Sequence, residues 1–139
     1  ERWTLREMAA RLRSGEIYRT PEVDALQDRI IEEILMVVER KGVRISEPDP
    51  RKKIKEHCRV RYNRPSMMQH VEQGRRTEID ALNGALVREA RALGIAVFYN
   101  EAIVAVVKGL EKSRRQRLHE PPIDYAKREE EAEKEVKRK

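Results

Sequence analysis

The sequence has 139 residues, and its 31 Lys and Arg against 25 Asp and Glu give a formal net charge of +6. This length leaves room for one hydrophobic core, because domains usually contain about 100–150 residues. The single cysteine, Cys58, excludes an intramolecular disulfide framework and a multi-cysteine metal site, and it favours a reducing, cytoplasmic compartment. No apolar run reaches the roughly 18 residues that a membrane-spanning helix needs, so no segment is expected to cross a membrane.

The first residues predict the end of a helix inside a longer protein. The chain begins at Glu1 with neither an initiator Met nor the basic and apolar segments of a signal peptide, so we expect it to be cut from a longer chain. Apolar residues at helical spacing then predict a helix that ends near Ser14 and Gly15. These apolar residues are Leu5, Met8, Ala9 and Leu12.

The strongest helix signal lies between Thr20 and Gly42. A threonine is typical of a helix N-cap, and Pro21 suits the first helical position. Gly42 suits the left-handed conformation that ends many helices. The apolar face between these signals consists of Val23, Leu26, Ile30, Ile34, Val37 and Val38.

Two further helices follow the same rules. Asp49 as N-cap and Pro50 in the first turn begin one helix, which Pro65 interrupts. Pro65 then begins a short helix over residues 66–73, which Gly74 ends.

The next helix is expected to have Thr77 as its cap and Gly94 at its end. Its apolar face consists of Ile79, Leu82, Leu86, Ala90 and Leu93. The apolar run over 95–99 is too short for a helix and has no partner strand, so we expect a buried extended connector.

Asn100 is expected to cap a last core helix, and Pro121 interrupts the chain beyond it. Residues 111–139 contain ten basic and eight acidic side chains, which can form a helix but bury little. The sequence therefore predicts an all-α helical bundle over 1–112 and a charged C-terminal extension over 113–139.

Most catalytic motifs are absent from the sequence. Its glycines are at least ten residues apart, which excludes a G-x-G-x-x-G or P-loop phosphate cradle within this chain. No metal site is expected, because His57, His70 and His119 lack a second ligand at helical spacing.

One polar region could bind an anion. Asn63 and Ser66 lie three residues apart, beside the free backbone N–H groups of the helix that Pro65 begins. Such a helix start can bind a carboxylate or a phosphate. From composition alone, helix capping is the favoured account of Ser66, Thr77, Glu78 and Asp80.

The order of residues between 63 and 100 also resembles a known sequence signature. The sequence reads P-S-M-M-Q at 65–69, G-R-R-T-E-I-D-A-L-N-G at 74–84, G-I at 94–95 and N at 100. This order resembles the signature of the C-terminal domain of the ketopantoate reductase (2-dehydropantoate 2-reductase) family, which belongs to the 6-phosphogluconate dehydrogenase-like superfamily. The aspartate that usually follows P-S-M-x-Q is His70 here, and the proline usual before the last Asn is missing.

The resemblance implies half of an oxidoreductase. The family joins an N-terminal Rossmann domain that binds NADPH to a helical domain, and it reduces ketopantoate, a 2-keto acid, to pantoate in pantothenate and coenzyme A synthesis. By resemblance, Ser66 holds the substrate carboxylate, Asn63 lines the same cleft, and Glu78 closes on the nucleotide and substrate. The family's proton-donor lysine would lie before Glu1, so the isolated chain is expected to be inactive.

Three alternatives stay open at this stage. The chain could be a helical module that binds a protein or a nucleic acid through the basic clusters at 51–53, 75–76 and 114–115, although it has few aromatic residues for base stacking. It could belong to a relative that reduces another 2-keto acid. Exposed apolar faces could also pair two copies into a homodimer.

Overall fold

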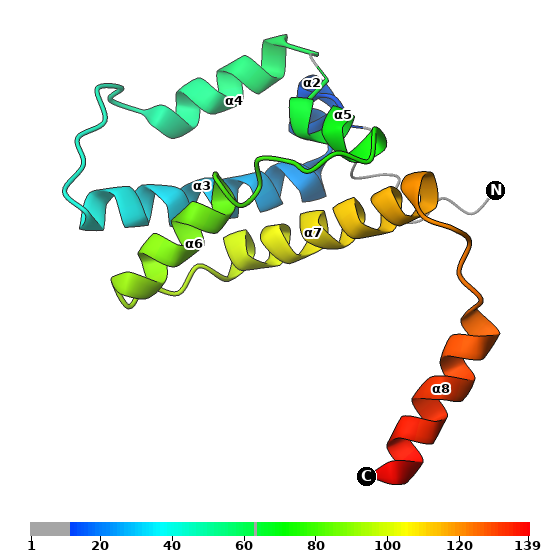
Figure 1. Ribbon diagram of the computed structural model, residues 1–139. Coiled ribbons are helices and arrows are strands. Elements are labelled where there is room, and N and C mark those ends of the chain that lie inside the picture. Colours follow the sequence, from blue (N-terminus) through cyan, green and yellow to red (C-terminus); the bar gives the residue numbers. More distant parts are fainter. Residues whose placement is uncertain (1–11, 63) are drawn as a thin grey trace.

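The computed structural model describes residues 12–62 and 64–139, which form helices and connecting segments with no strand among them (Figure 1). This confirms the all-α fold class. The helices are α2 (Ser14–Arg19), α3 (Pro21–Arg40), α4 (Pro50–Val60), α5 (Ser66–Glu72), α6 (Asn83–Ala92), α7 (Phe98–His119) and α8 (Tyr125–Arg138). The predicted apolar positions Leu5, Met8 and Ala9 and the candidate site residue Asn63 lie outside the described residues.

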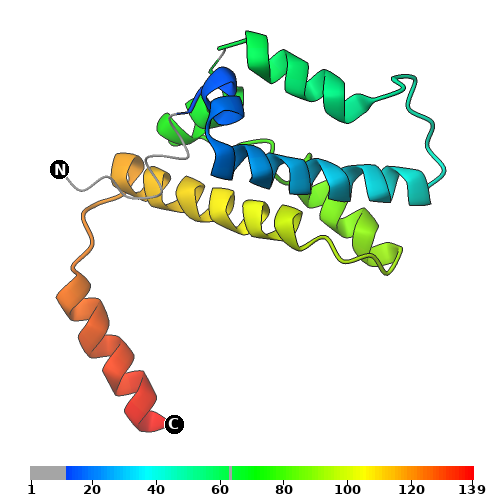
Figure 2. The ribbon, with the colours of Figure 1, turned by 180° about the vertical axis from the view of Figure 1, so that it is seen from behind.

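The hydrophobic core lies between α3, α6 and α7. Figures 1 and 2 show α3 and α7 running side by side, with α6 packed against both. The buried cluster consists of Val37, Val87, Ala90 and Val97. Each buried valine side chain contributes about 1.5–3 kcal/mol to stability, so these few contacts hold the three helices together.

The predicted ends of several helices are confirmed. The helix α3 begins at Pro21, and Gly42 after it has a φ of 72°. Asp49 caps α4, because its side chain accepts a hydrogen bond from the backbone N–H of Lys52 at 3.0 Å. Gly74 and Gly94 also have positive φ, as predicted for the residues that end the neighbouring helices.

The start of the described chain differs from the prediction. Ser14 begins a helix instead of ending one. The side chain of Glu16 accepts a hydrogen bond from the backbone N–H of Arg13, the N-cap residue, at 2.6 Å, and this contact stabilises the start of α2. Thr20 is the N-cap residue of α3, but its hydroxyl donates to the carbonyl of Glu16 at 2.8 Å and does not cap α3. The last carbonyls of α2 need donors, and Thr20 is the nearest.

The helix α2 packs against α4 through a close aromatic contact. Gly15 is buried, and a Cβ atom at this position would lie 2.6 Å from ring carbons of Tyr62. Arg19 lies over the same ring at 5.1 Å and donates to the carbonyl of Arg59 at 3.1 Å. These contacts fix the end of α4, from which the chain leads into residues 61–65.

The start of α7 also differs from the prediction. Asn100 lies inside the first turn of α7 and is fully buried, so it is not the N-cap. The carboxylate of Glu33 in α3 instead accepts hydrogen bonds from the backbone N–H groups of Tyr99 and Asn100, at 3.2 and 2.9 Å. A neighbouring helix thus supplies the cap. The predicted buried connector over 95–99 is largely wrong, because only Val97 in it is buried and α7 already begins at the exposed Phe98.

A charged cluster joins α3 to α4. Lys55 lies 2.5 Å from Asp24 and 3.0 Å from Asp28. Burial raises the pKa of Asp28, but hydrogen bonds from Lys55 and Arg51 and their charges outweigh it and hold that pKa below its usual value. Burial lowers the pKa of Lys55, but the two aspartates outweigh it and the pKa is raised.

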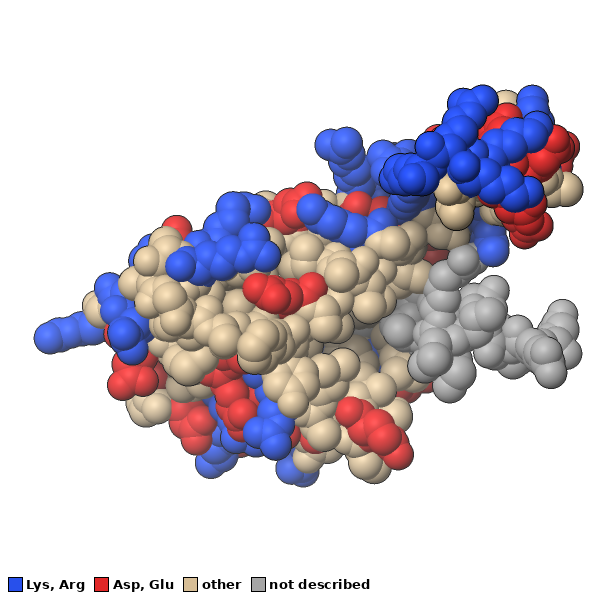
Figure 3. Space-filling model, turned by 90° about the horizontal axis from the view of Figure 1, so that it is seen from below, with Lys and Arg blue, Asp and Glu red and all other residues tan. Residues whose placement is uncertain are grey.

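The C-terminal helix stands apart from the bundle. The helix α7 runs without a break through residue 112 to His119, and α8 projects from its far end without a buried residue (Figures 1 and 2). Charged side chains of both signs cover α8, whereas uncharged side chains occupy the middle of the face seen from below (Figure 3). The boundary at 112 stays a prediction. None of the described helices is long and apolar enough to cross a membrane.

Candidate functional site

The short helix α5 presents Ser66 at an exposed start. Pro65 is its N-cap, with φ −58° and ψ 135°, and Ser66 is its first residue. The first backbone N–H groups of a helix have no acceptor within it, and in α5 these groups lie at the Ser66 end. The predicted helix start is confirmed, and the pairing of Ser66 with Asn63, which is not described, stays a prediction.

Contacts on the other face hold α5 in place. Met68 and Val71 are buried, and Arg114 of α7 donates to the carbonyl of Glu72 at 3.1 Å. Glu72 also pairs with Arg64, just before the helix. The helix α5 is therefore anchored through its apolar side and its C-terminal end, which leaves the Ser66 end accessible.

The segment between α5 and α6 carries Glu78. The sequence predicts a helix capped by Thr77, and this is wrong, because α6 begins only at Asn83. The backbone N–H and hydroxyl of Thr77 both donate to the carboxylate of Glu111 in α7, the N–H at 2.6 Å. A contact from α7 therefore replaces the predicted cap, and Glu78 projects from a short irregular segment, where its side chain is exposed.

Glu78 and α5 meet at His70. The Oε1 atom of Glu78 lies 3.2 Å from Nδ1 of His70, which pairs the two side chains when the imidazole is protonated. Nδ1 is shielded from solvent, and no well-aligned hydrogen bond reaches it from the described residues.

A buried polar network lies behind this region. Asn100 donates from Nδ2 to Glu33 Oε1 at 3.0 Å and accepts from Nδ2 of Asn83 at 2.8 Å. Sequence reasoning missed Glu33 and Glu111. Glu33 had a signal, because an acid at this position interrupts the apolar face formed by Ile30 and Val37. Glu111 had no such signal, since it lies among the charged residues that begin at position 111.

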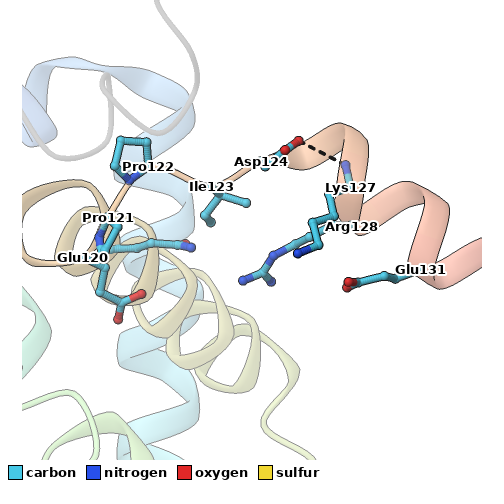
Figure 4. Close-up of a pocket in the computed structure, with 9 residues that line it drawn as sticks. Glu120, Pro121, Pro122, Ile123, Asp124, Lys127, Arg128 and Glu131 are labelled. Carbon is cyan, nitrogen blue, oxygen red and sulfur yellow. Dashed lines mark hydrogen bonds between the residues drawn. The ribbon is translucent and has the colours of Figure 1, made fainter.

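The structure offers little for a metal ion or a second ligand. No three His, Cys, Asp or Glu side chains in the described part of the chain lie close enough to hold a metal. A hollow of about 530 Å³ lies between the end of α7 and the first turns of α8 (Figure 4). Its lining holds charged side chains of both signs, so no single ligand class is favoured; these are Glu120, Asp124, Lys127, Arg128 and Glu131. Ser66 and Glu78 do not line it.

Comparison with solved structures defines the class of fold. The ternary structure of a D-mandelate dehydrogenase with NADH and anilino(oxo)acetate superposes with a TM-score of 0.63 over 74% of this chain and 44% of that one, at 24% identity. At this identity the likeness concerns the fold alone. The chain thus has the helical-domain fold that occurs in dehydrogenases.

The family follows from the sequence match. The model of the ketopantoate reductase PanE/ApbA C-terminal domain matches residues 7–111, and the chain belongs to this family. A 2-dehydropantoate 2-reductase from Archaeoglobus fulgidus is 31% identical over 101 residues, which are 73% of this chain and 34% of that protein. The corresponding enzyme from Shigella flexneri is 38% identical over 96 residues, 68% of this chain and 31% of that protein.

A solved ketopantoate reductase agrees with this assignment. The PanE/ApbA family ketopantoate reductase from Ralstonia eutropha JMP134 superposes with a TM-score of 0.70 at 31% identity. The aligned part is 75% of this chain and 35% of that one. The chain therefore spans about a third of the length of the relatives that it matches.

Proposed function

We propose that this chain is the substrate-binding and interdomain part of an NADPH-dependent 2-dehydropantoate 2-reductase. The complete enzyme reduces ketopantoate to pantoate in pantothenate and coenzyme A synthesis, in the cytoplasm. The observation that carries the proposal is the family match over residues 7–111, which includes the exposed Ser66 and Glu78. The helical domain is residues 1–112, and 113–139 form an extension.

Ser66 and Asn63 bind the carboxylate of the 2-keto acid. A hydroxyl beside free backbone N–H groups offers several donors to one anion, and hydrogen bonds to a charged acceptor are stronger than neutral ones. Ser66 has the exposure and the position for this role. Anchoring the carboxylate fixes where the neighbouring keto carbon lies, and so orients it for reduction.

Glu78 contacts the nucleotide. An exposed carboxylate is an acceptor for hydroxyl donors, as the sugar of a dinucleotide presents them, so Glu78 fits one part of this cofactor. The glycine spacing fits no phosphate cradle, so an N-terminal Rossmann domain holds most of the molecule. NADPH supplies the hydride when it is bound. The proton donor is a lysine outside the chain, and the chain alone is inactive.

Two further parts of the proposal concern partners. The exposed Phe98 and Val106 of α7 support a homodimer in which this face is covered. The cluster at 51–53 does not favour nucleic acid, because Arg51 pairs with Asp28 and Lys53 pairs with Glu47. These ion pairs neutralise much of the positive charge of the cluster within the chain.

The experiment is steady-state kinetics on the chain joined to its nucleotide-binding domain. Ser66→Ala should raise the KM for ketopantoate about tenfold or more, because a hydrogen bond to a charged group is lost. The matched control is Ser46→Ala, in the exposed loop before α4, which should leave both kinetic constants unchanged. An unchanged KM in Ser66→Ala would count against the anchor.

A further inference from the structure

Glu111, near the middle of α7, makes a double contact with the segment that carries Glu78. One carboxylate oxygen, Oε1, accepts hydrogen bonds from both the backbone N–H and the hydroxyl of Thr77. Both contacts are partly buried, and the donors and acceptor come from positions 34 residues apart. A half-buried carboxylate with two donors forms charge-assisted bonds, which are stronger and better directed than neutral ones.

The hydroxyl of Thr77 passes this restraint on to the next residues. While it donates to Glu111, it accepts from the backbone N–H of Ile79 at 3.2 Å. The side chain of Ile79 is only 1% exposed and acts as an apolar anchor. Glu111 thus fixes the residues on both sides of Glu78, while the Glu78 side chain itself stays exposed.

The fixed segment sets where the Glu78 carboxylate lies. Its Oε1 atom lies 3.2 Å from Nδ1 of His70, in the same helix that begins at Ser66. A second contact to the segment, Lys108 to Asp80 at 2.8 Å, joins side chains that are 51% and 62% exposed. Exposed ion pairs of this kind contribute about 0–1 kcal/mol, so Lys108 adds little restraint.

We propose that Glu111 is a positioning residue for Glu78. It holds Thr77 and Ile79 so that the carboxylate between them lies beside His70 of α5, and it touches neither substrate nor cofactor. This inference rests on the proposed function, in which Glu78 closes on the bound molecules. Loss of Glu111 leaves Glu78 present but poorly placed, and misplacement by about 1 Å can cost up to about a hundredfold in rate.

The test is a double-mutant cycle in the two-domain protein, with ketopantoate and NADPH. Glu111→Ala should lower kcat about tenfold or more while the KM for ketopantoate changes less than about threefold, since Ser66 is untouched. In a Glu78→Ala background the same substitution should have no further effect, because its role acts through Glu78. Glu111→Gln should recover most of the rate, since an amide oxygen can still accept from Thr77.

Two other variants separate positioning from folding. Lys108→Ala, the matched control on the same helix, should keep kcat within about twofold. Thr77→Val keeps the shape of the side chain but removes the hydroxyl, and it should lower kcat in the same way as Glu111→Ala. Equal losses from Glu111→Ala with and without Glu78 would overturn the proposal, as would a loss of kcat in Lys108→Ala equal to that in Glu111→Ala.

Amide hydrogen exchange tests the restraint independently of activity. Glu111→Ala should speed exchange at the backbone N–H groups of Thr77 and Ile79, while Lys108→Ala should leave both unchanged. Unchanged exchange in Glu111→Ala would overturn the positioning role. A wild-type two-domain protein without reductase activity would instead refute the proposed function, and exchange alone would then decide whether Glu111 fixes this segment.

Discussion

Glu33 in α3 and Asn100 in α7 form a pair that is almost completely hidden from solvent. One oxygen of Glu33, Oε1, accepts from both the backbone N–H and the side-chain Nδ2 of Asn100, at 2.9 and 3.0 Å. Asn100 is fully buried and Glu33 is 8% exposed. A buried carboxylate depends on such donors, because removing them leaves a polar group without water or partner.

Asn100→Leu should therefore lower the free energy of unfolding by about 2–4 kcal/mol. The substitution removes the side-chain donor from Glu33 and leaves its carboxylate poorly paired in the bundle. Urea denaturation of the 139-residue chain measures the change. Asn83→Ala is the matched control, because it removes only the outer bond to Asn100 and should cost about 1 kcal/mol. A loss below about 1 kcal/mol for Asn100→Leu would contradict this account.

Gly15→Ala should also destabilise the chain, by about 1–3 kcal/mol. The new Cβ atom would lie 2.6 Å from ring carbons of Tyr62, so the ring must move and disturb the packing of α2 on α4. Gly109→Ala in α7 is the control, since nothing lies within 4 Å of its Cβ position, and it should stabilise by about 0.5–1 kcal/mol. Thermal unfolding of both variants should move the midpoints in opposite directions, and a shift in the same direction would refute the clash.

The cluster of Lys55 with Asp24 and Asp28 should make stability depend on pH at both extremes. The pKa of Asp28 is lowered in the folded chain. Its contribution is therefore complete above the ordinary aspartate pKa of about 3.9 and is lost as pH falls through the lowered value. Lys55 has a raised pKa, so its contribution is complete below about pH 10.4 and is lost as pH rises through the raised value.

Asp28→Asn should consequently lower the free energy of unfolding at pH 6, and the difference from wild type should shrink as pH falls below about 4. Chemical denaturation at several pH values measures this difference. A difference for Asp28→Asn that stays constant down to pH 2 would show that Lys55 and Arg51 do not favour the ionised form of Asp28.

Removal of the C-terminal helix should leave the bundle intact. The helix α8 has no buried residue, and its Lys134–Glu130 pair lies within the helix. A chain that ends after His119 should keep its free energy of unfolding within about 0.5 kcal/mol, as for other exposed changes. Circular dichroism during urea denaturation measures this. A loss above about 1 kcal/mol would place α8 against the bundle.

Local signals predicted those features that depend on neighbours in the sequence. Gly42, Gly74 and Gly94 mark helix ends because only glycine adopts positive φ at low cost, and the structure confirms all three. Asp49 caps α4 because its acceptor and the Lys52 N–H are three residues apart. Spacing of this kind is visible in any sequence.

Features that depend on distant residues were predicted wrongly or missed. Asn100 was assigned the cap of α7, but Glu33, 67 residues earlier, supplies it. Thr77 was assigned the cap of α6, but it bonds Glu111, 34 residues later. An Asn or Thr before an apolar face can cap its own helix or bond a distant side chain, and the local sequence is the same in both cases. Only the packing of α3, α6 and α7 decides which partner it meets. The start of α5 at Ser66, by contrast, could be predicted from Pro65 alone.

The most direct test of the central claim is the oxidation of NADPH in the presence of ketopantoate, followed for the chain joined to the proposed nucleotide-binding domain and for the 139 residues alone. The account predicts turnover by the two-domain protein, a much lower kcat for its Glu78→Ala variant, and no turnover by the chain alone. A two-domain protein that binds NADPH but leaves ketopantoate unreduced would contradict it, as would hydride transfer by the 139 residues without a second domain.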